Sequence, residues 1–212
     1  MLIKICGLST PETIEAAAQA GATHVGLVHF VKSPRHLELK EAAELKICVP
    51  ERIKTVLLLA DVEAELAERA IEEVQPDIVQ FHGKEQPDWI ASFREKTGVE
   101  VWKALGIRDE QCLSQSALFE GAVDRLLFDA PPPSERPDLP GGNGVGFDWS
   151  LLKGHHNSIP WGLAGGLGPD NVADAISATG TPLVDASSGL ESAPGIKDVD
   201  KIAAFCKAAL SL

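Results

Sequence analysis

The chain has 212 residues and a formal net charge of −12, with 44% hydrophobic and 24% charged residues, which is the composition of a globular protein. The excess of negative charge disfavours nucleic acid and anionic membranes as partners. No stretch approaches the roughly 18 apolar residues of a membrane span, and the N-terminus lacks the basic region of a signal peptide, so the sequence predicts one cytoplasmic domain over residues 1–212.

Short β-branched or apolar runs alternate with Ala- and Glu-rich stretches of helical spacing along the chain. In chain order, strands are predicted at 2–6, 24–29, 54–59, 78–82, 100–105, 125–130, 161–165 and 183–187. Helices are predicted at 11–20, 39–48, 62–74, 87–96, 109–117, 148–153, 170–178 and 198–211. The first helix has clear end signals, because Thr10 and Pro11 suit its start and Gly21 its end.

Eight strands, each followed by a helix, indicate an α/β protein with a parallel sheet. Eight such units favour a closed (β/α)8 TIM barrel. An open doubly wound sheet is the alternative, but the glycine fingerprint expected after its first strand is absent from Cys6-Gly7-Leu8-Ser9. One irregular loop, 131–146, is rich in Pro and Gly, which is typical of a binding loop or lid.

The cysteines are far apart and form no CxxC pair: Cys6, Cys48, Cys112 and Cys206. In a cytoplasmic protein this arrangement predicts neither a disulfide framework nor a zinc site. No group of His, Cys, Asp and Glu has metal-ligand spacing in the sequence, so no metal is expected. Cys206 lies in an amphipathic helical pattern and is expected to be a buried apolar residue.

Polar residues stand at the carboxyl ends of several predicted strands, where the active sites of barrel enzymes lie. Alternation along each strand places them on its inward face: Cys6, His82, Asp129, Asp185 and Ser187. Burying an unpaired polar group costs about 1–3 kcal/mol, so these residues are better explained by a ligand than by core packing. Cys6 and Asp129 form a possible base and acid pair, although either alone is ambiguous. Base chemistry near neutral pH requires a thiol with a lowered pKa.

Loops containing Gly and Ser follow the seventh and eighth predicted strands, where barrel enzymes frequently bind phosphate. Gly165 and Gly166 let backbone N–H groups approach phosphate oxygens, and Ser187 and Ser188 add hydroxyl or amide donors. Arg35 follows the second strand and suits a carboxylate on the same ligand. The alternatives are tight turns without a ligand and a solvated surface arginine.

Several motifs of the chain, taken in their order along the sequence, resemble those of the phosphoribosylanthranilate isomerase family. The matching segments include Lys4-Ile5-Cys6-Gly7, Lys32-Ser33-Pro34-Arg35, Val79-Gln80-Phe81-His82-Gly83, Leu127-Phe128-Asp129, Leu163-Ala164-Gly165-Gly166-Leu167 and Asp185-Ala186-Ser187-Ser188-Gly189. The resemblance covers residues 3–198. Asn143 departs from the family pattern, because Ser or Thr is usual at that position of the glycine-rich loop.

The resemblance implies an enzyme of tryptophan biosynthesis that uses no cofactor. Its reaction is the Amadori rearrangement of N-(5-phosphoribosyl)anthranilate to 1-(2-carboxyphenylamino)-1-deoxyribulose 5-phosphate. Cys6 is then the general base and Asp129 the general acid, and Arg35 holds the anthranilate carboxylate. The loops at Gly165-Gly166 and Ser187-Ser188 hold the phosphate, and His82 and Asp185 complete the substrate site. For the oligomeric state, the sequence is compatible with both a monomer and a homodimer.

Two other functions fit parts of this pattern. The histidine-pathway aminoaldose isomerase performs the same rearrangement, but its substrate carries two phosphates and its acid–base pair is two aspartates. A cysteine on the first strand and one clear phosphate site argue against it. A non-catalytic phosphate-binding barrel is the second alternative, and it would not need Cys6 and Asp129 paired across the mouth.

Overall fold

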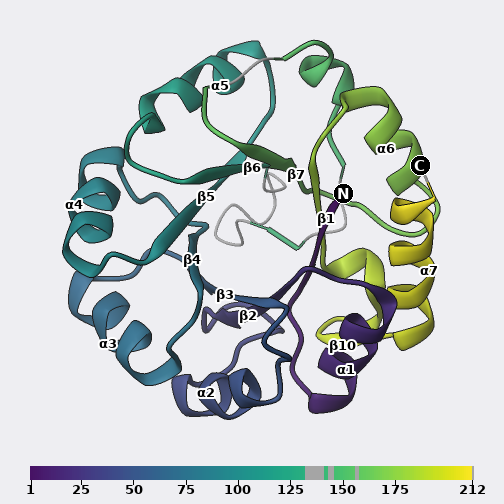
Figure 1. Ribbon diagram of the computed structural model, residues 1–212. Helices are drawn as coiled ribbons and strands as arrows, with labels where there is room; N and C mark the ends of the chain where they lie inside the picture. The colour runs from purple at the N-terminus through teal and green to yellow at the C-terminus, as the bar shows by residue number, and fades with distance from the viewer. Residues whose placement is uncertain (132–140, 143–145, 156–157, 212) are drawn as a thin grey trace.

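The computed structural model describes residues 1–131, 141–142, 146–155 and 158–211. Within this part of the chain, eight strands close into a barrel in the order β1 to β8, and helices surround it (Figure 1). The strands pair in parallel, including the closing pair of β1 with β8, where Ile3 lies opposite Val184. The predicted TIM barrel is confirmed.

The barrel strands are Leu2–Cys6 (β1), His24–His29 (β2), Lys54–Leu59 (β3), Ile78–Phe81 (β4), Glu100–Gly106 (β5), Arg125–Asp129 (β6), Trp161–Leu163 (β7) and Leu183–Ala186 (β8). The α-helices are Pro11–Ala20 (α1), Leu39–Ile47 (α2), Ala64–Val74 (α3), Pro87–Thr97 (α4), Glu110–Gln115 (α5), Val172–Thr179 (α6) and Val199–Leu210 (α7). Short 3-10 helices occur at Ser116–Phe119 (η1), Trp149–Leu152 (η2) and Ser188–Leu190 (η3). A hairpin of Glu191–Ala193 (β9) and Ile196–Lys197 (β10) precedes α7. No helix among the described residues has both the length and the apolar character of a membrane span.

Most predicted bounds lie within one or two residues of the observed ones. The helix predicted at 109–117 is α5 followed by the 3-10 helix η1. Three further differences have a local cause. The strand predicted to reach 165 ends at Leu163, because Gly165 and Gly166 adopt the left-handed φ values of 86° and 63°. The helix predicted at 148–153 is the short η2, which Asp148 caps by accepting a hydrogen bond from the N–H of Ser150. The β9–β10 hairpin is absent from the prediction, since its strands are too short to show alternation.

The barrel interior is filled by side chains below its mouth. A layer of inward-facing residues packs across it: Val56, Ile78, Trp102, Ala104, Leu127 and Leu183. A second, larger core lies between the strands and the helices and contains Phe205 and Cys206 of α7, both fully buried. The expectation for Cys206 is thus confirmed. Because this layer of described residues fills the barrel below its mouth, the interior is open to a ligand at the carboxyl ends of the strands.

We expect Phe205→Ala to lower the free energy of unfolding by about 3–5 kcal/mol, because it removes a buried aromatic ring and leaves a cavity. Phe205 is 0% exposed. The matched control is Leu118→Ala, at a side chain that is 67% exposed, where a change within about 0.5 kcal/mol is expected. Urea titrations of both variants measure the difference. Equal losses for the two variants would contradict the packing described for α7.

Candidate active site

A pocket opens at the carboxyl ends of the barrel strands. All nine residues selected from the sequence line it: Cys6, Arg35, His82, Asp129, Gly165, Gly166, Asp185, Ser187 and Ser188. Residues separated by more than 180 positions in the chain therefore meet at one site.

Cys6 ends β1 and is 5% exposed. On the neighbouring strand, a Cβ at Gly26 would lie 2.7 Å from its Sγ, so only glycine leaves room for the thiol. Burial raises the pKa of the Cys6 thiol, and the positive charges of Lys4 and Lys197 lower it without cancelling the effect of burial. The free protein therefore favours the thiol form of Cys6, and the lowered pKa expected from the sequence for a base is not found.

Lys4 and Asp185 form a buried ion pair beside Cys6, with Nζ and Oδ2 2.7 Å apart. Burial lowers the pKa of Lys4, but Asp185 and Cys6 outweigh this and hold it above its ordinary value. Lys4 is therefore a fixed cation next to the thiol. The sequence showed that it shares the inward face of β1, but not that it is paired with Asp185.

Asp129 ends β6, three positions from β1 around the closed barrel. Its Oδ1 accepts a hydrogen bond of 2.7 Å from the N–H of Ala130, and its Oδ2 lies 3.2 Å from Nε2 of His82. Gly141 approaches both side chains so closely that a Cβ there would lie 3.1 Å from Oδ2 of Asp129. The carboxyl group is thus held in place, with one oxygen facing the pocket and His82.

Some buried polar atoms of the pocket make no hydrogen bond among the described residues: Oε1 of Gln80, Oδ1 of Asp185, and Nε2 of His82, whose 3.2 Å contact with Oδ2 of Asp129 lacks hydrogen-bond geometry. All three residues line the pocket. Leaving such an atom unpaired costs about 1–3 kcal/mol, so a ligand with hydroxyl groups would relieve this cost. Gln80 is not among the site residues predicted from the sequence, although it lies on the same strand face as His82.

The two loops predicted to bind phosphate lie against each other beside the pocket, since a Cβ at Gly189 would clash with the carbonyl oxygen of Leu167. Asn171 holds the first loop, because its Oδ1 accepts from the N–H of Gly168 at 2.9 Å and its Nδ2 donates to the carbonyl of Gly166 at 3.0 Å. The short helix η3 begins at Ser188, within the second loop. The hydroxyl of Ser187 donates to the carbonyl of Cys6 at 3.0 Å. Ser187 is therefore left with its backbone N–H, rather than its hydroxyl, to donate to an anion.

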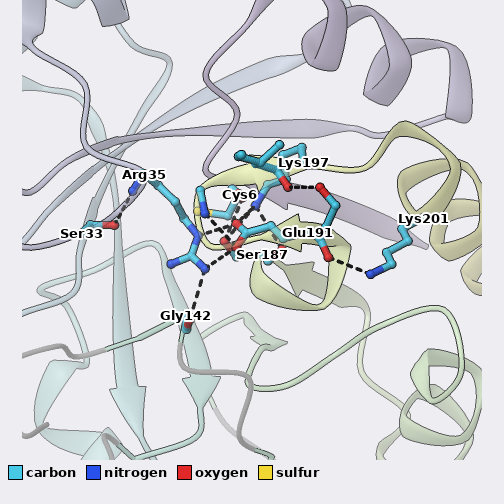
Figure 2. Close-up of polar contacts among 11 residues, drawn as sticks. Cys6, Ser33, Arg35, Gly142, Ser187, Glu191, Lys197 and Lys201 are labelled. Atoms are coloured by element: carbon cyan, nitrogen blue, oxygen red, sulfur yellow. Dashed lines mark hydrogen bonds and ion pairs between the residues drawn. The ribbon is translucent and has the colours of Figure 1, made fainter.

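Arg35 is 6% exposed, which excludes the alternative of a solvated surface arginine. As Figure 2 shows, its guanidinium group meets the carboxylate of Glu191. Nε lies 2.6 Å from Oε1 and Nη2 lies 2.8 Å from Oε2. Nη2 also donates to the carbonyl of Gly142 at 3.2 Å. These contacts occupy the bidentate edge that a substrate carboxylate was expected to use, and the contacts found among the described residues leave Nη1 for a ligand.

A possible metal-binding group lies outside this pocket. Ligand atoms of His29, His36 and Glu38 all lie within 4.8 Å of one another, although their sequence spacing did not indicate a site. About 4.2 Å is the widest separation that zinc bonds of about 2.1 Å allow, so the side chains would have to move to bind an ion. Asn143 and most of the loop 131–146 lie outside the described residues.

A closed (β/α)8 barrel whose mouth combines a thiol, a carboxyl group and two loops with the glycines and serines of a predicted phosphate site is typical of a barrel enzyme that acts on a small anionic molecule. The family described as N-(5'phosphoribosyl)anthranilate (PRA) isomerase matches residues 3–208, and the chain belongs to this family. It is 64% identical over 208 residues to an N-(5'-phosphoribosyl)anthranilate isomerase of Erythrobacter litoralis, covering 98% of each chain.

Solved structures give the same result. The phosphoribosyl anthranilate isomerase of Thermotoga maritima is 31% identical, with a TM-score of 0.89 and full coverage of both chains. A second isomerase structure, 30% identical with a TM-score of 0.87 and full coverage of both chains, is a complex with reduced 1-(o-carboxyphenylamino)-1-deoxyribulose 5-phosphate.

Proposed function

We propose that this protein converts N-(5-phosphoribosyl)anthranilate to 1-(2-carboxyphenylamino)-1-deoxyribulose 5-phosphate in tryptophan biosynthesis. The observation that carries the proposal is that Cys6 and Asp129 line one pocket with Arg35 and the two Gly- and Ser-containing loops. The substrate has a phosphate at one end, a carboxylate at the other and the reacting sugar carbons between them. The relative with the reduced compound bound supports the same ligand class.

In the proposed mechanism, Asp129 first acts as the general acid. It donates a proton to the furanose ring oxygen, and the C1′–O bond breaks as the nitrogen lone pair forms a Schiff base. The positively charged Schiff base makes the C2′ proton more acidic. Because Oδ1 of Asp129 already accepts a hydrogen bond from the N–H of Ala130, Oδ2 is the oxygen that would hold the transferred proton.

Cys6 then acts as the general base. Its thiolate removes the proton from C2′, the electron pair moves to the Schiff-base nitrogen, and the resulting enolamine tautomerises to the aminoketone. Lys4 and Lys197 stabilise the thiolate, since both lower the pKa of Cys6. A high thiol pKa makes the thiolate a stronger base but a less abundant one.

The test of this function is turnover by the purified protein without added cofactor. The anthranilate ring of the substrate fluoresces, so conversion is followed as a loss of fluorescence beyond spontaneous decay. No acceleration of this loss would contradict the proposal. Parallel trials with the histidine-pathway substrate, which carries two phosphates, separate the two isomerase activities.

Arg35→Ala is expected to raise KM by about tenfold to a hundredfold with a smaller effect on kcat, because a hydrogen bond to a charged group contributes about 1.5–3 kcal/mol. Arg69→Ala is the matched control, since Arg69 pairs with Glu73 on an exposed face of α3. Steady-state kinetics of both variants measure the effect. An unchanged KM in Arg35→Ala would remove Arg35 from the carboxylate site.

Other features expected from the sequence stay predictions. They are the single domain over residues 1–212, the cytoplasmic location and a monomeric or homodimeric state. The individual roles proposed for His82, Asp185 and Ser188 in substrate binding also stay predictions.

A further inference from the structure

The β9–β10 hairpin is an addition to the eight-unit barrel, and it lies beside the loop that carries Arg35. Its two strands pair with Glu191 opposite Lys197. Its turn contains Gly195 with a φ of 83°, and a Cβ at Gly195 would clash with the carbonyl oxygen of Pro34. The hairpin therefore contacts the β2–α2 loop one residue before Arg35.

Glu191 points from this hairpin toward Arg35 and accepts four hydrogen bonds. Oε1 accepts from Nε of Arg35 and from Nζ of Lys197, each at 2.6 Å. Oε2 accepts from Nη2 of Arg35 at 2.8 Å and from the N–H of Gly195 at 3.1 Å. Burial raises the pKa of Glu191, but its hydrogen bonds to Arg35 and Lys197 outweigh this and hold the pKa below its ordinary value. The side chain is thus an ionised carboxylate that Arg35 and Lys197 share.

Lys197 joins this carboxylate to the second phosphate loop. Its Nζ donates to the carbonyl of Ser187 at 3.0 Å and lies 3.3 Å from the Ser187 hydroxyl, which in turn donates to the carbonyl of Cys6. Figure 2 shows this series of contacts from Arg35 to Cys6. Neither Glu191 nor Lys197 is among the residues that line the pocket, so both act through residues that do.

Charge and geometry give opposite expectations for the removal of Glu191. Arg35 and Lys197 carry two positive charges against one negative charge on Glu191. If net charge alone mattered, neutralising Glu191 would strengthen the binding of a substrate with a phosphate and a carboxylate. If the fixed direction of the guanidinium group matters, the same change would weaken binding, because Arg35 loses two charge-assisted hydrogen bonds that hold it.

We propose that Glu191 is a positioning residue that fixes the guanidinium group of Arg35 for the carboxylate of the substrate. Lys197 links Glu191 to the Ser187 loop. The part of the site that binds the carboxylate and the part that binds the phosphate are therefore held in a fixed position relative to each other. The proposal rests on the proposed function, because it takes the substrate carboxylate as the group that Arg35 meets.

The test compares Glu191→Gln with wild type on two substrates, N-(5-phosphoribosyl)anthranilate and the aniline analogue that lacks the carboxylate. For the anthranilate substrate we expect KM to rise by about tenfold or more, with kcat within about threefold of wild type. For the aniline analogue, wild type and variant should have the same KM within about twofold. A fall or no change in KM for anthranilate, or an equal rise for both substrates, would overturn the proposal.

Further variants control for changes in folding. Lys201→Met is the matched control, because Lys201 donates at 2.7 Å to the backbone carbonyl of Glu191 and not to its carboxylate. Its KM should stay near that of wild type. The double variant Arg35→Ala with Glu191→Gln should have the same KM as Arg35→Ala alone, and additive effects would count against coupling through Arg35. If Glu191→Gln does not fold, Glu191→Asp keeps the charge, shortens the side chain and should raise the KM for anthranilate alone.

A binding measurement separates this proposal from the proposed function. Calorimetry with reduced 1-(o-carboxyphenylamino)-1-deoxyribulose 5-phosphate and with its decarboxylated analogue requires no turnover. Weaker binding of only the first compound by Glu191→Gln supports the positioning role even if no isomerisation is observed. Equal binding of both compounds by the variant and wild type contradicts that role.

Discussion

Cys6→Ser is expected to lower kcat by about 10²- to 10⁴-fold while the barrel stays folded, because a hydroxyl is a far poorer source of an anionic base than a thiol. Serine fits the space that Gly26 leaves beside Cys6, so packing is preserved. The fluorescence assay measures kcat, and circular dichroism checks the fold. Near-normal turnover in Cys6→Ser would exclude Cys6 as the base.

The control for this variant is Cys48→Ser, because Cys48 is exposed at the end of α2 and should not affect turnover. The pH profile adds a second measurement. Burial raises the pKa of the Cys6 thiol, and the base acts in its deprotonated form. The kcat/KM of the wild type should therefore rise with pH through that pKa and fall as the pH drops below it. This rise should be missing in Cys6→Ser.

Asp129→Asn is expected to lower kcat by about 10²- to 10⁴-fold, because an amide cannot donate a proton to the ring oxygen of the substrate. The asparagine keeps the shape of the side chain, and its Oδ1 can still accept the hydrogen bond from the N–H of Ala130. The loss is therefore expected in turnover and not in folding. Single-turnover fluorescence traces measure the step directly.

Two comparisons make the Asp129 result specific. Asp88→Asn, at an exposed position of α4, should leave kcat unchanged. His82→Gln tests the other group within reach of a proton, since Nε2 of His82 lies 3.2 Å from Oδ2 of Asp129. We expect a smaller loss in His82→Gln than in Asp129→Asn. A larger loss would assign the acid to His82.

The helices and strands of this fold can be predicted from the sequence where apolar spacing and capping residues are clear. The strand at 24–29 and the helix at 11–20 have the predicted bounds, because a short apolar run defines the strand and clear capping residues define the helix. The predicted helix at 148–153 is only a short 3-10 turn, since apolar spacing over so few residues does not distinguish the two.

The residues that make up the site can be predicted from the sequence for a different reason. A period of two along each strand, together with the rule that barrel sites lie at the carboxyl ends, is enough to place Cys6, Asp129 and Asp185 on one pocket. The ion-pair and hydrogen-bond partners of the site residues cannot be predicted from the sequence. Arg35 pairs with Glu191, 156 residues away, and no local pattern encodes which carboxylate meets which cation. The protonation state of Cys6 likewise depends on burial that only the folded chain creates.

The seam between β1 and β8 has a consequence for how the protein acquires its activity. Lys4 and Asp185, which pair across it, are separated by 181 residues, so this contact has a very large sequence separation and forms slowly. Until it forms, β1 and β8 present unpaired edges that are open to association with other chains. Cys6 and Ser187 lie at the two sides of the same seam. During refolding, recovery of turnover should therefore lag behind recovery of the helical circular dichroism signal. The delay would report the closing of the barrel by the pairing of β1 with β8.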